Sequence, residues 1–318
     1  MSVLNRLGVP AAVLVGVAVV VGWRAQRRMA TRSAWLMGLS AGGMEYVLAG
    51  EGPRTALIIP GGPGSSLPVG PSGWMMTVNW KHFQTAGYRV CYATRPRNMP
   101  PGHSIADMAG DYARFIRDEL DGRVDLVVGE SYGGLIAFYL AANNPEVARY
   151  VVAAGAAATV PAAAREQDRQ WARLRAEGRN TEAGAVMAEM MMPGPGRAWL
   201  KRLLAPLLGA LGAGLKVPAG DLMVEADAEC SFEATDVLEH AARVNVPLLL
   251  VFGDKDEYIP VESFEETAAK IPDCTVVRYD GVGHAGSMMR SNFPRDVLAW
   301  VGQRDHEKDT AAEPAPAT

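Results

Sequence analysis

From residue 35 onward, short apolar runs rich in Val, Leu and Ile alternate with longer helical stretches. The apolar runs fall at residues 45–48, 56–59, 89–93, 124–128, 150–153, 248–252 and 275–279. They lack regular polar positions, which is typical of strands buried on both faces of a sheet. The stretches expected to be helices fall at residues 104–120, 135–143, 261–271 and 295–301. This alternation predicts an α/β fold with a mostly parallel central sheet flanked by helices.

One long interval breaks the alternation and divides the predicted domain. Residues 155–240 contain no convincing strand and have strong helical character, with a charged, a methionine-rich and a leucine-rich segment. We therefore expect a helical cap at 155–240, inserted between core parts at 35–154 and 241–302. The Met and Leu side chains fit the packing of this cap on the sheet, or alternatively the lining of a pocket for an apolar small-molecule substrate. Residues 303–318 are polar and rich in Ala and Pro, which predicts a disordered tail.

The N-terminal segment has a different composition. Residues 1–44 contain no acidic residue, and residues 7–23 are an uncharged apolar run flanked by Arg6 and by a cluster of arginines that follows it. The cluster occupies the place where a signal peptide would be cleaved, so residues 1–34 are predicted to be an uncleaved membrane anchor with a transmembrane helix and a basic flank. The positive-inside rule then places the catalytic domain in the cytoplasm. A cleaved targeting peptide and a buried core helix are the alternatives.

Composition narrows the remaining function classes. The net charge is −4, and no stripe of Lys and Arg runs through the body of the chain, so no nucleic-acid partner is expected. The three cysteines, Cys91, Cys230 and Cys274, are too few and too widely spaced for a disulfide framework or a CxxC metal site. This pattern favours a reducing compartment.

A candidate nucleophile lies between a predicted strand and a predicted helix. Residues 129–133 match G-x-S-x-G, with Ser131 at the centre; the run 124–128 precedes them and the stretch 135–143 follows. A nucleophile elbow requires this context, because the serine must stand on a sharp turn from strand to helix. The second match, at residues 38–42, precedes every predicted core strand and leads into an extended stretch. Ser131 is therefore the predicted nucleophile.

A serine nucleophile needs a histidine base and a carboxylate that orients it. His284 is flanked by glycines in a loop just after the last predicted strand, whereas the other histidines precede Ser131 or lie in a charged helix and in the tail. For the carboxylate, Asp254 and Asp256 both follow the run 248–252. We predict Asp256 as the acid, with Asp254 as the alternative.

An oxyanion hole needs two backbone N–H groups near the nucleophile. The residue after the nucleophile, Tyr132, is expected to supply one of them. The second is expected from Gly62, in the glycine-rich segment 60–64 that follows the run 56–59. Pro63 has no N–H to donate. A plain glycine turn is the alternative reading of this segment.

Taken together, these motifs resemble the α/β-hydrolase superfamily over residues 43–302. The shared features are the glycine-rich loop, the elbow serine, the histidine loop and an acid turn of the form G-x-x-D-x-x-x-P, matched by Gly253, Asp256 and Pro260. The resemblance supports Asp256 over Asp254. It implies a serine hydrolase that cleaves a carboxylic ester or related acyl compound through an acyl-enzyme, with no cofactor and no metal. Haloalkane dehalogenases and epoxide hydrolases of this fold are excluded, because they would have Asp at position 131.

Two branches of the superfamily share parts of this pattern. The segment 61–64 resembles that of proline iminopeptidases, although Pro60 stands where they carry histidine. An aminopeptidase is therefore an alternative, and it would need a cap carboxylate facing Ser131. The candidates for that carboxylate are Glu182, Glu189, Asp221 and Glu225. The elbow is also similar to that of serine carboxypeptidases, which are secreted and carry disulfides. A third hypothesis, a non-catalytic binding protein on this fold, is disfavoured because all three triad positions are kept.

Overall fold

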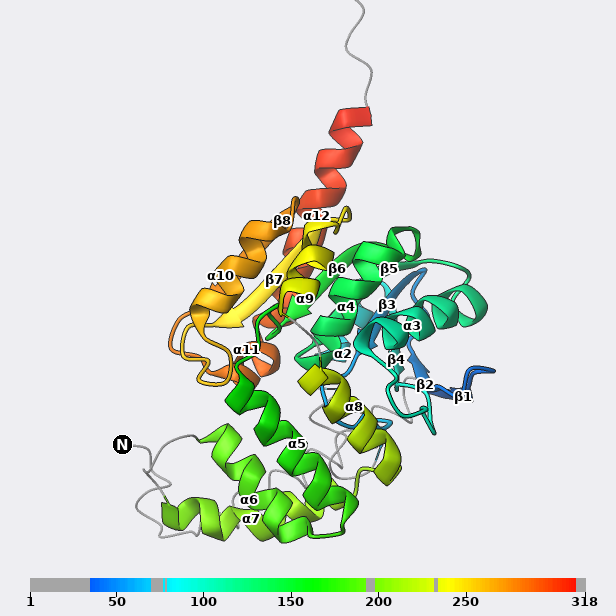
Figure 1. The fold of residues 1–318 in the computed structure, drawn as a ribbon. Coiled ribbons are helices and arrows are strands. Elements are labelled where there is room, and N and C mark those ends of the chain that lie inside the picture. The colour runs from blue at the N-terminus through cyan, green and yellow to red at the C-terminus, as the bar shows by residue number, and fades with distance from the viewer. Residues whose placement is uncertain (1–34, 70–76, 78, 193–197, 232–233, 313–318) are drawn as a thin grey trace, which may run out of the picture.

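The computed structural model describes residues 35–69, 77, 79–192, 198–231 and 234–312. Within these residues the centre is an eight-stranded sheet in the order β1-β2-β4-β3-β5-β6-β7-β8 (Figure 1). Strand β2 runs antiparallel to both β1 and β4, and the strands from β4 to β8 are parallel to one another. The strands are β1 (Leu36–Leu39), β2 (Glu45–Ala49), β3 (Arg54–Ile59), β4 (Tyr88–Ala93), β5 (Val124–Glu130), β6 (Ala148–Ala154), β7 (Leu248–Gly253) and β8 (Cys274–Tyr279). The predicted mostly parallel central sheet is confirmed.

Each predicted apolar run lies within one of the strands β2 to β8, whereas β1 was not predicted. Strand β1 has four residues and forms the edge of the sheet beside β2. Its side chains Leu36, Met37 and Leu39 are exposed. A short strand with this exposure carries no burial pattern that sequence reasoning could detect.

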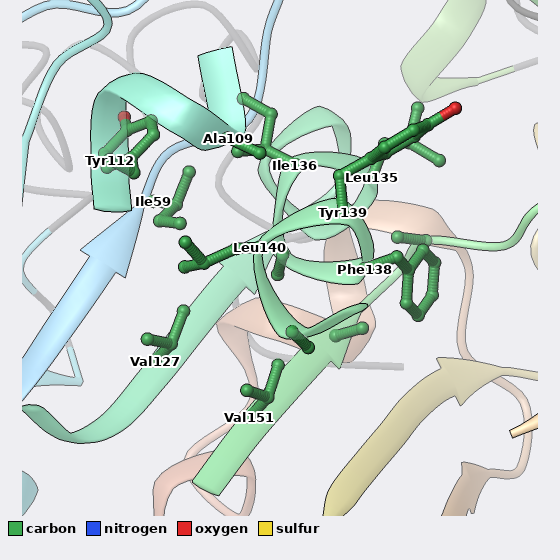
Figure 2. Close-up of a cluster of buried hydrophobic side chains, with 14 of the residues drawn as sticks. Ile59, Ala109, Tyr112, Val127, Leu135, Ile136, Phe138, Tyr139, Leu140 and Val151 are labelled. Carbon is green, nitrogen blue, oxygen red and sulfur yellow. The ribbon is translucent and has the colours of Figure 1, made fainter. Parts of the chain in front are cut away.

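The central strands are buried on both faces, which explains their unbroken apolar runs. In β3, Leu57 and Ile59 pack on the face covered by α3 (Ile105–Glu119), α4 (Tyr132–Asn143) and α10 (Val261–Lys270). Figure 2 shows α4 seated over this face, with Ile59, Val127 and Val151 beneath it. The alternate residues Ala56 and Ile58 pack on the opposite face, which is covered by α2 (Trp80–Thr85) and α12 (Phe293–Ala312).

In the described part of the connection from β6 to β7, all regular elements are helices. Helices α5 (Ala162–Ala176), α6 (Asn180–Met191), α7 (Ala198–Ala213) and α8 (Ala219–Ser231) gather beyond one end of the sheet (Figure 1). The last helix of the connection, α9 (Ala234–Ala242), lies against α4 instead, where the Tyr139 hydroxyl donates to Asp236 at 2.5 Å. We therefore propose that the cap consists of α5 to α8 and that α9 belongs to the core.

The predicted disordered tail is wrong for residues 303–312, because α12 continues through Ala312. Charged side chains in this stretch bind the core. Arg304 pairs with Asp273 at 2.5 Å, and Asp305 pairs with Arg149 at 2.7 Å and accepts a hydrogen bond from the Tyr150 hydroxyl at 2.7 Å. The polar composition suggested disorder because the sequence does not show these distant partners. Residues 313–318 lie outside the described residues.

The predicted membrane anchoring is also corrected. None of the helices in the described ranges combines the length and the apolar composition that crossing a bilayer requires. Helix α7, for example, is apolar but has 16 residues and carries Lys201 and Arg202, whereas α12 has 20 residues but many charges. For the described chain, the predicted membrane-anchored localisation with a cytoplasmic catalytic domain is wrong. Residues 7–23, on which it rests, lie outside the described residues.

Candidate active site

Ser131 lies on the sharp turn between β5 and α4, as the motif predicts. Its backbone has φ 50° and ψ −118°, a conformation that costs a non-glycine residue about 1–3 kcal/mol. Two glycines make the turn possible by allowing close approach. A Cβ on Gly129 would lie 2.4 Å from the carbonyl oxygen of Gly133, and one on Gly133 would lie 2.2 Å from that of Ile59. The fold therefore holds Ser131 in a strained position above the ends of β3 and β5.

His284 begins the short helix α11 (His284–Met289) and contacts Ser131 across the sheet end. The Ser131 Oγ lies 2.9 Å from His284 Nε2, and His284 Nδ1 lies 2.8 Å from Asp256 Oδ2. The loops after β7 and β8 meet at Gly253, where a Cβ would lie 2.1 Å from the carbonyl oxygen of Val282. This close approach brings Asp256 and His284 together, so the three predicted residues form one hydrogen-bonded chain.

The two aspartates of the turn after β7 have different partners. The second carboxylate oxygen of Asp256 accepts hydrogen bonds from the N–H groups of Tyr258 at 3.0 Å and Ile259 at 2.9 Å. Its side chain is fully buried, with 0% exposure. Asp254 accepts from the N–H of Gly281 at 2.5 Å and so ties the turn after β7 to the turn after β8. Asp256, and not Asp254, faces the histidine.

The two predicted oxyanion donors belong to residues near Ser131. Gly62 lines the same pocket as Ser131 and His284. Tyr132 is the first residue of α4, so its N–H belongs to the first turn, where backbone N–H groups have no partner within the helix. The positive end of the helix dipole adds to the attraction for a negative oxygen. The arrangement is suited to stabilising an anion beside Ser131.

A cavity of about 400 Å³ opens over Ser131 and His284 and is bounded by the cap. Helix α6 contributes Met187, Met190 and Met191 to its wall. The methionine-rich segment therefore lines a pocket, which was the alternative to core packing. Tyr258 also lines the pocket, and its ring centroid lies 5.0 Å from that of His284.

The four cap carboxylates considered from the sequence do not line this pocket. Glu182 pairs with Arg179 at the surface, and Glu189 pairs with Lys201 at 2.6 Å. Asp221 accepts hydrogen bonds from the N–H groups of Asn98 and Met99, and Glu225 pairs with Arg95 at 2.8 Å. All four are therefore engaged elsewhere in the fold.

The acidic cap residue that does line the pocket is Asp168 of α5, which sequence reasoning missed. It is 3% exposed and accepts a hydrogen bond from the Tyr258 hydroxyl. Burial, reinforced by the neighbouring Glu229, raises the pKa of Asp168 well above its ordinary value. Burial likewise raises the pKa of Glu229 to about 7. Asp168 lies in a stretch crowded with charged residues, so no local signal distinguishes it.

Sequence reasoning also missed Arg95, which is fully buried next to the glycine-rich loop. A charged residue two positions after the apolar run 89–93 was an available signal. As for metals, no group of three or more His, Cys, Asp or Glu side chains in the described ranges is arranged to hold an ion.

Comparison with known proteins places this geometry in a family. The alpha/beta hydrolase fold family matches residues 57–290. The putative carbamate hydrolase RutD of Serratia proteamaculans (strain 568) is 26% identical over 239 residues, which are 72% of this chain and 86% of that protein. A non-heme chloroperoxidase of Streptomyces lividans is 27% identical over 270 residues, 76% of this chain and 93% of that protein. The structure of the enol-lactonase from Burkholderia xenovorans LB400 aligns with a TM-score of 0.63 at 20% identity, covering 84% of this chain and 100% of that one. Because the family match spans most of the chain, this protein belongs to the α/β-hydrolase family of enzymes.

Proposed function

We propose that the protein hydrolyses a carboxylic ester or a related acyl compound through an acyl-enzyme on Ser131. The observation that carries the proposal is the hydrogen-bonded chain from Ser131 Oγ through His284 to Asp256, at 2.9 Å and 2.8 Å, on the floor of the pocket. A hydroxyl, an imidazole and a buried carboxylate in this order can activate a serine for attack on a carbonyl carbon.

The proposed reaction has two halves. In the first, the Ser131 oxygen attacks the carbonyl carbon while His284 Nε2 takes the hydroxyl proton, and Asp256 stabilises the resulting imidazolium. The N–H groups of Gly62 and Tyr132 stabilise the negative oxygen of the tetrahedral intermediate. His284 then protonates the departing alcohol, which leaves the acyl group on Ser131. In the second half, His284 activates a water molecule that releases the acid and restores the serine.

The pocket favours a substrate with an apolar part. The three methionine side chains of α6 offer a flexible, polarisable wall that can adapt to acyl or alcohol groups of different shape. The relative named as a putative carbamate hydrolase supports chemistry at a carbonyl group, because a carbamate carries the same type of carbon for the serine to attack.

The aminopeptidase alternative is less well supported. An aminopeptidase needs an ionised carboxylate to hold the ammonium group of its substrate. Asp168 is the acidic cap residue at the pocket, but burial raises its pKa and the Tyr258 hydroxyl already donates to it. A protonated or occupied carboxyl offers little to an ammonium group, so the ester is the better candidate.

The test combines a substrate panel with variants of two serines. Purified protein is assayed on p-nitrophenyl esters of graded chain length and on proline β-naphthylamide, and is labelled with a fluorophosphonate probe. Ser131→Ala should remain folded, lose roughly 10⁶-fold in rate and escape labelling. The matched control is Ser40→Ala, which changes the serine of the second G-x-S-x-G segment. Ser40 accepts a hydrogen bond from Met44 N–H and does not line the pocket over Ser131. Equal labelling of wild type and Ser131→Ala would refute the proposal, and preference for the prolyl amide would favour the aminopeptidase.

A further inference from the structure

The glycine-rich loop that carries Gly62 rests on a buried arginine. Arg95 follows β4 and has 0% exposure. Its Nη1 donates to the carbonyl oxygen of Pro60 at 2.8 Å, and its Nη2 donates to that of Gly61 at 2.9 Å. The planar guanidinium therefore holds the two carbonyl groups that immediately precede Gly62, with a fixed geometry that an ammonium group could not reproduce.

A glutamate of the cap completes this support. Glu225, on α8, is 0% exposed, and its Oε2 lies 2.8 Å from Arg95 Nη2. The same oxygen accepts a hydrogen bond from the N–H of Gly64 at 2.5 Å. Arg95 thus holds the loop before Gly62, and Glu225 holds it after Gly62.

The pair contacts both residues that are predicted to supply the oxyanion donors, Gly62 through its backbone and Tyr132 through its side chain. A Cβ on Gly62 would lie 2.7 Å from Arg95 Nη2 and 3.1 Å from Glu225 Oε2, so the loop packs directly on the pair. The Tyr132 hydroxyl donates to the carbonyl oxygen of Glu225 at 2.9 Å, and the Arg95 guanidinium lies over the Tyr132 ring at 5.0 Å. Arg95 and Glu225 therefore touch Gly62 and Tyr132 at the same time.

Stability alone does not account for such a pair. Burying two charges costs more in desolvation than a well-packed apolar pair of similar volume, and replacement by apolar residues is often neutral or stabilising. Moreover, within the described chain, Arg95 Nε and Glu225 Oε1 have no hydrogen-bond partner although both atoms are buried. An oxyanion hole, in contrast, depends on donors that are fixed before the reaction begins.

We propose that Arg95 and Glu225 are positioning residues that fix the N–H groups of Gly62 and Tyr132 for the acyl transfer. This inference rests on the proposed function of Ser131. It assigns Glu225 to the support of the oxyanion loop rather than to the binding of a substrate ammonium group.

The decisive variant is the double replacement Arg95→Met and Glu225→Met, because it leaves no unpaired charge in the core. We expect it to stay folded, because removing both charges together avoids the large cost of one buried unpaired charge, although the hydrogen bonds to Pro60, Gly61 and Gly64 are lost. The kcat on a p-nitrophenyl ester, normalised to active sites titrated with diethyl p-nitrophenyl phosphate, should fall about 10- to 100-fold. KM should change less than about threefold, and the inhibition constant of a phenylboronic acid, which forms a tetrahedral adduct, should rise by a factor similar to the loss in kcat.

Two further variants separate positioning from packing. Arg95→Lys keeps the positive charge next to Glu225 but cannot donate to the carbonyl oxygens of both Pro60 and Gly61 as the guanidinium does. We therefore expect kcat to fall again while the protein stays folded. Asp221→Asn is the matched control. Asp221 is a buried carboxylate on the same helix, and it binds the backbone N–H groups of Asn98 and Met99 rather than the loop at 60–64. Its loss should lower stability and leave kcat per titrated site unchanged.

Failure of the proposed function and failure of the positioning inference would give different results. If the wild type neither reacts with the phosphate titrant nor hydrolyses esters, the proposed function itself fails. If the wild type is active and both the double variant and Arg95→Lys keep kcat within about twofold, the positioning inference is overturned. The same conclusion follows if Asp221→Asn lowers kcat as much as they do, since a general loosening of the cap would then explain the result.

Discussion

The exchange of Asp256 for Asn tests the proposed chain of hydrogen bonds at its most sensitive point. In the wild type, one carboxylate oxygen accepts from His284 Nδ1, and the other accepts from the N–H groups of Tyr258 and Ile259. An asparagine has one oxygen and one NH₂ group, so it cannot accept at both sides. If its oxygen stays with the two backbone N–H groups, its NH₂ faces His284 and places the ring proton on Nε2, where the ring can no longer accept from Ser131.

This geometry sets the size of the loss in kcat that we expect for Asp256→Asn. The two backbone N–H groups outweigh one histidine contact, so we expect the unfavourable tautomer to predominate. Loss of the correct tautomer with the geometry intact costs about 10⁴-fold in kcat, which corresponds to about 5.5 kcal/mol of transition-state stabilisation. Asp254→Asn is the matched control, because Asp254 binds Gly281 N–H and not the histidine. It should change kcat less than about tenfold.

The assay is steady-state hydrolysis of a p-nitrophenyl ester near pH 8, with thermal unfolding of each variant measured in parallel. Equal rates for wild type and Asp256→Asn, or a larger loss in Asp254→Asn, would refute the assignment of Asp256. A large drop in unfolding temperature for Asp256→Asn would show instead that the aspartate acts mainly by holding its turn together.

Two further predictions concern stability, measured by urea unfolding. Gly133→Ala should destabilise the protein by several kcal/mol or prevent folding, because its Cβ would lie 2.2 Å from the backbone oxygen of Ile59. Gly110→Ala is the control: no atom lies within 4 Å of the new Cβ, so the change should stabilise α3 by about 0.5–1 kcal/mol. Burial raises the pKa of Glu229 to about 7 and that of its neighbour Asp168 well above its ordinary value, so the folded chain holds protons that the unfolded chain releases. The free energy of unfolding should therefore fall as the pH rises from 4.5 to 7. Glu229→Gln should flatten this decline, and an unchanged slope between pH 4.5 and 7 would contradict the assignment.

Local patterns were sufficient to predict the fold. Strands β2 to β8 were predicted because central parallel strands are buried on both faces, and this burial leaves a continuous apolar run in the sequence. The elbow was equally predictable, since the strand, the glycines and the helix that surround Ser131 are contiguous. Strand β1 and the continuation of α12 escaped prediction, because an exposed edge strand and a charged helix held by distant partners have no such local signature.

The sequence by itself determined the order of the candidate residues and the strand-turn-helix setting of Ser131, because these depend on neighbours along the chain. It favoured Asp256 over Asp254 only through the resemblance of the turn to a known motif, because the direction of two side chains in one turn is not visible in the sequence. That choice depended on the contact of Gly253 with Val282, two loops brought together by the parallel pairing of β7 and β8. The placement of Asp168 at the pocket and of Glu225 against Arg95 was likewise decided by the docking of the cap, because a buried charge is identified by what surrounds it in space and not by its neighbours in sequence.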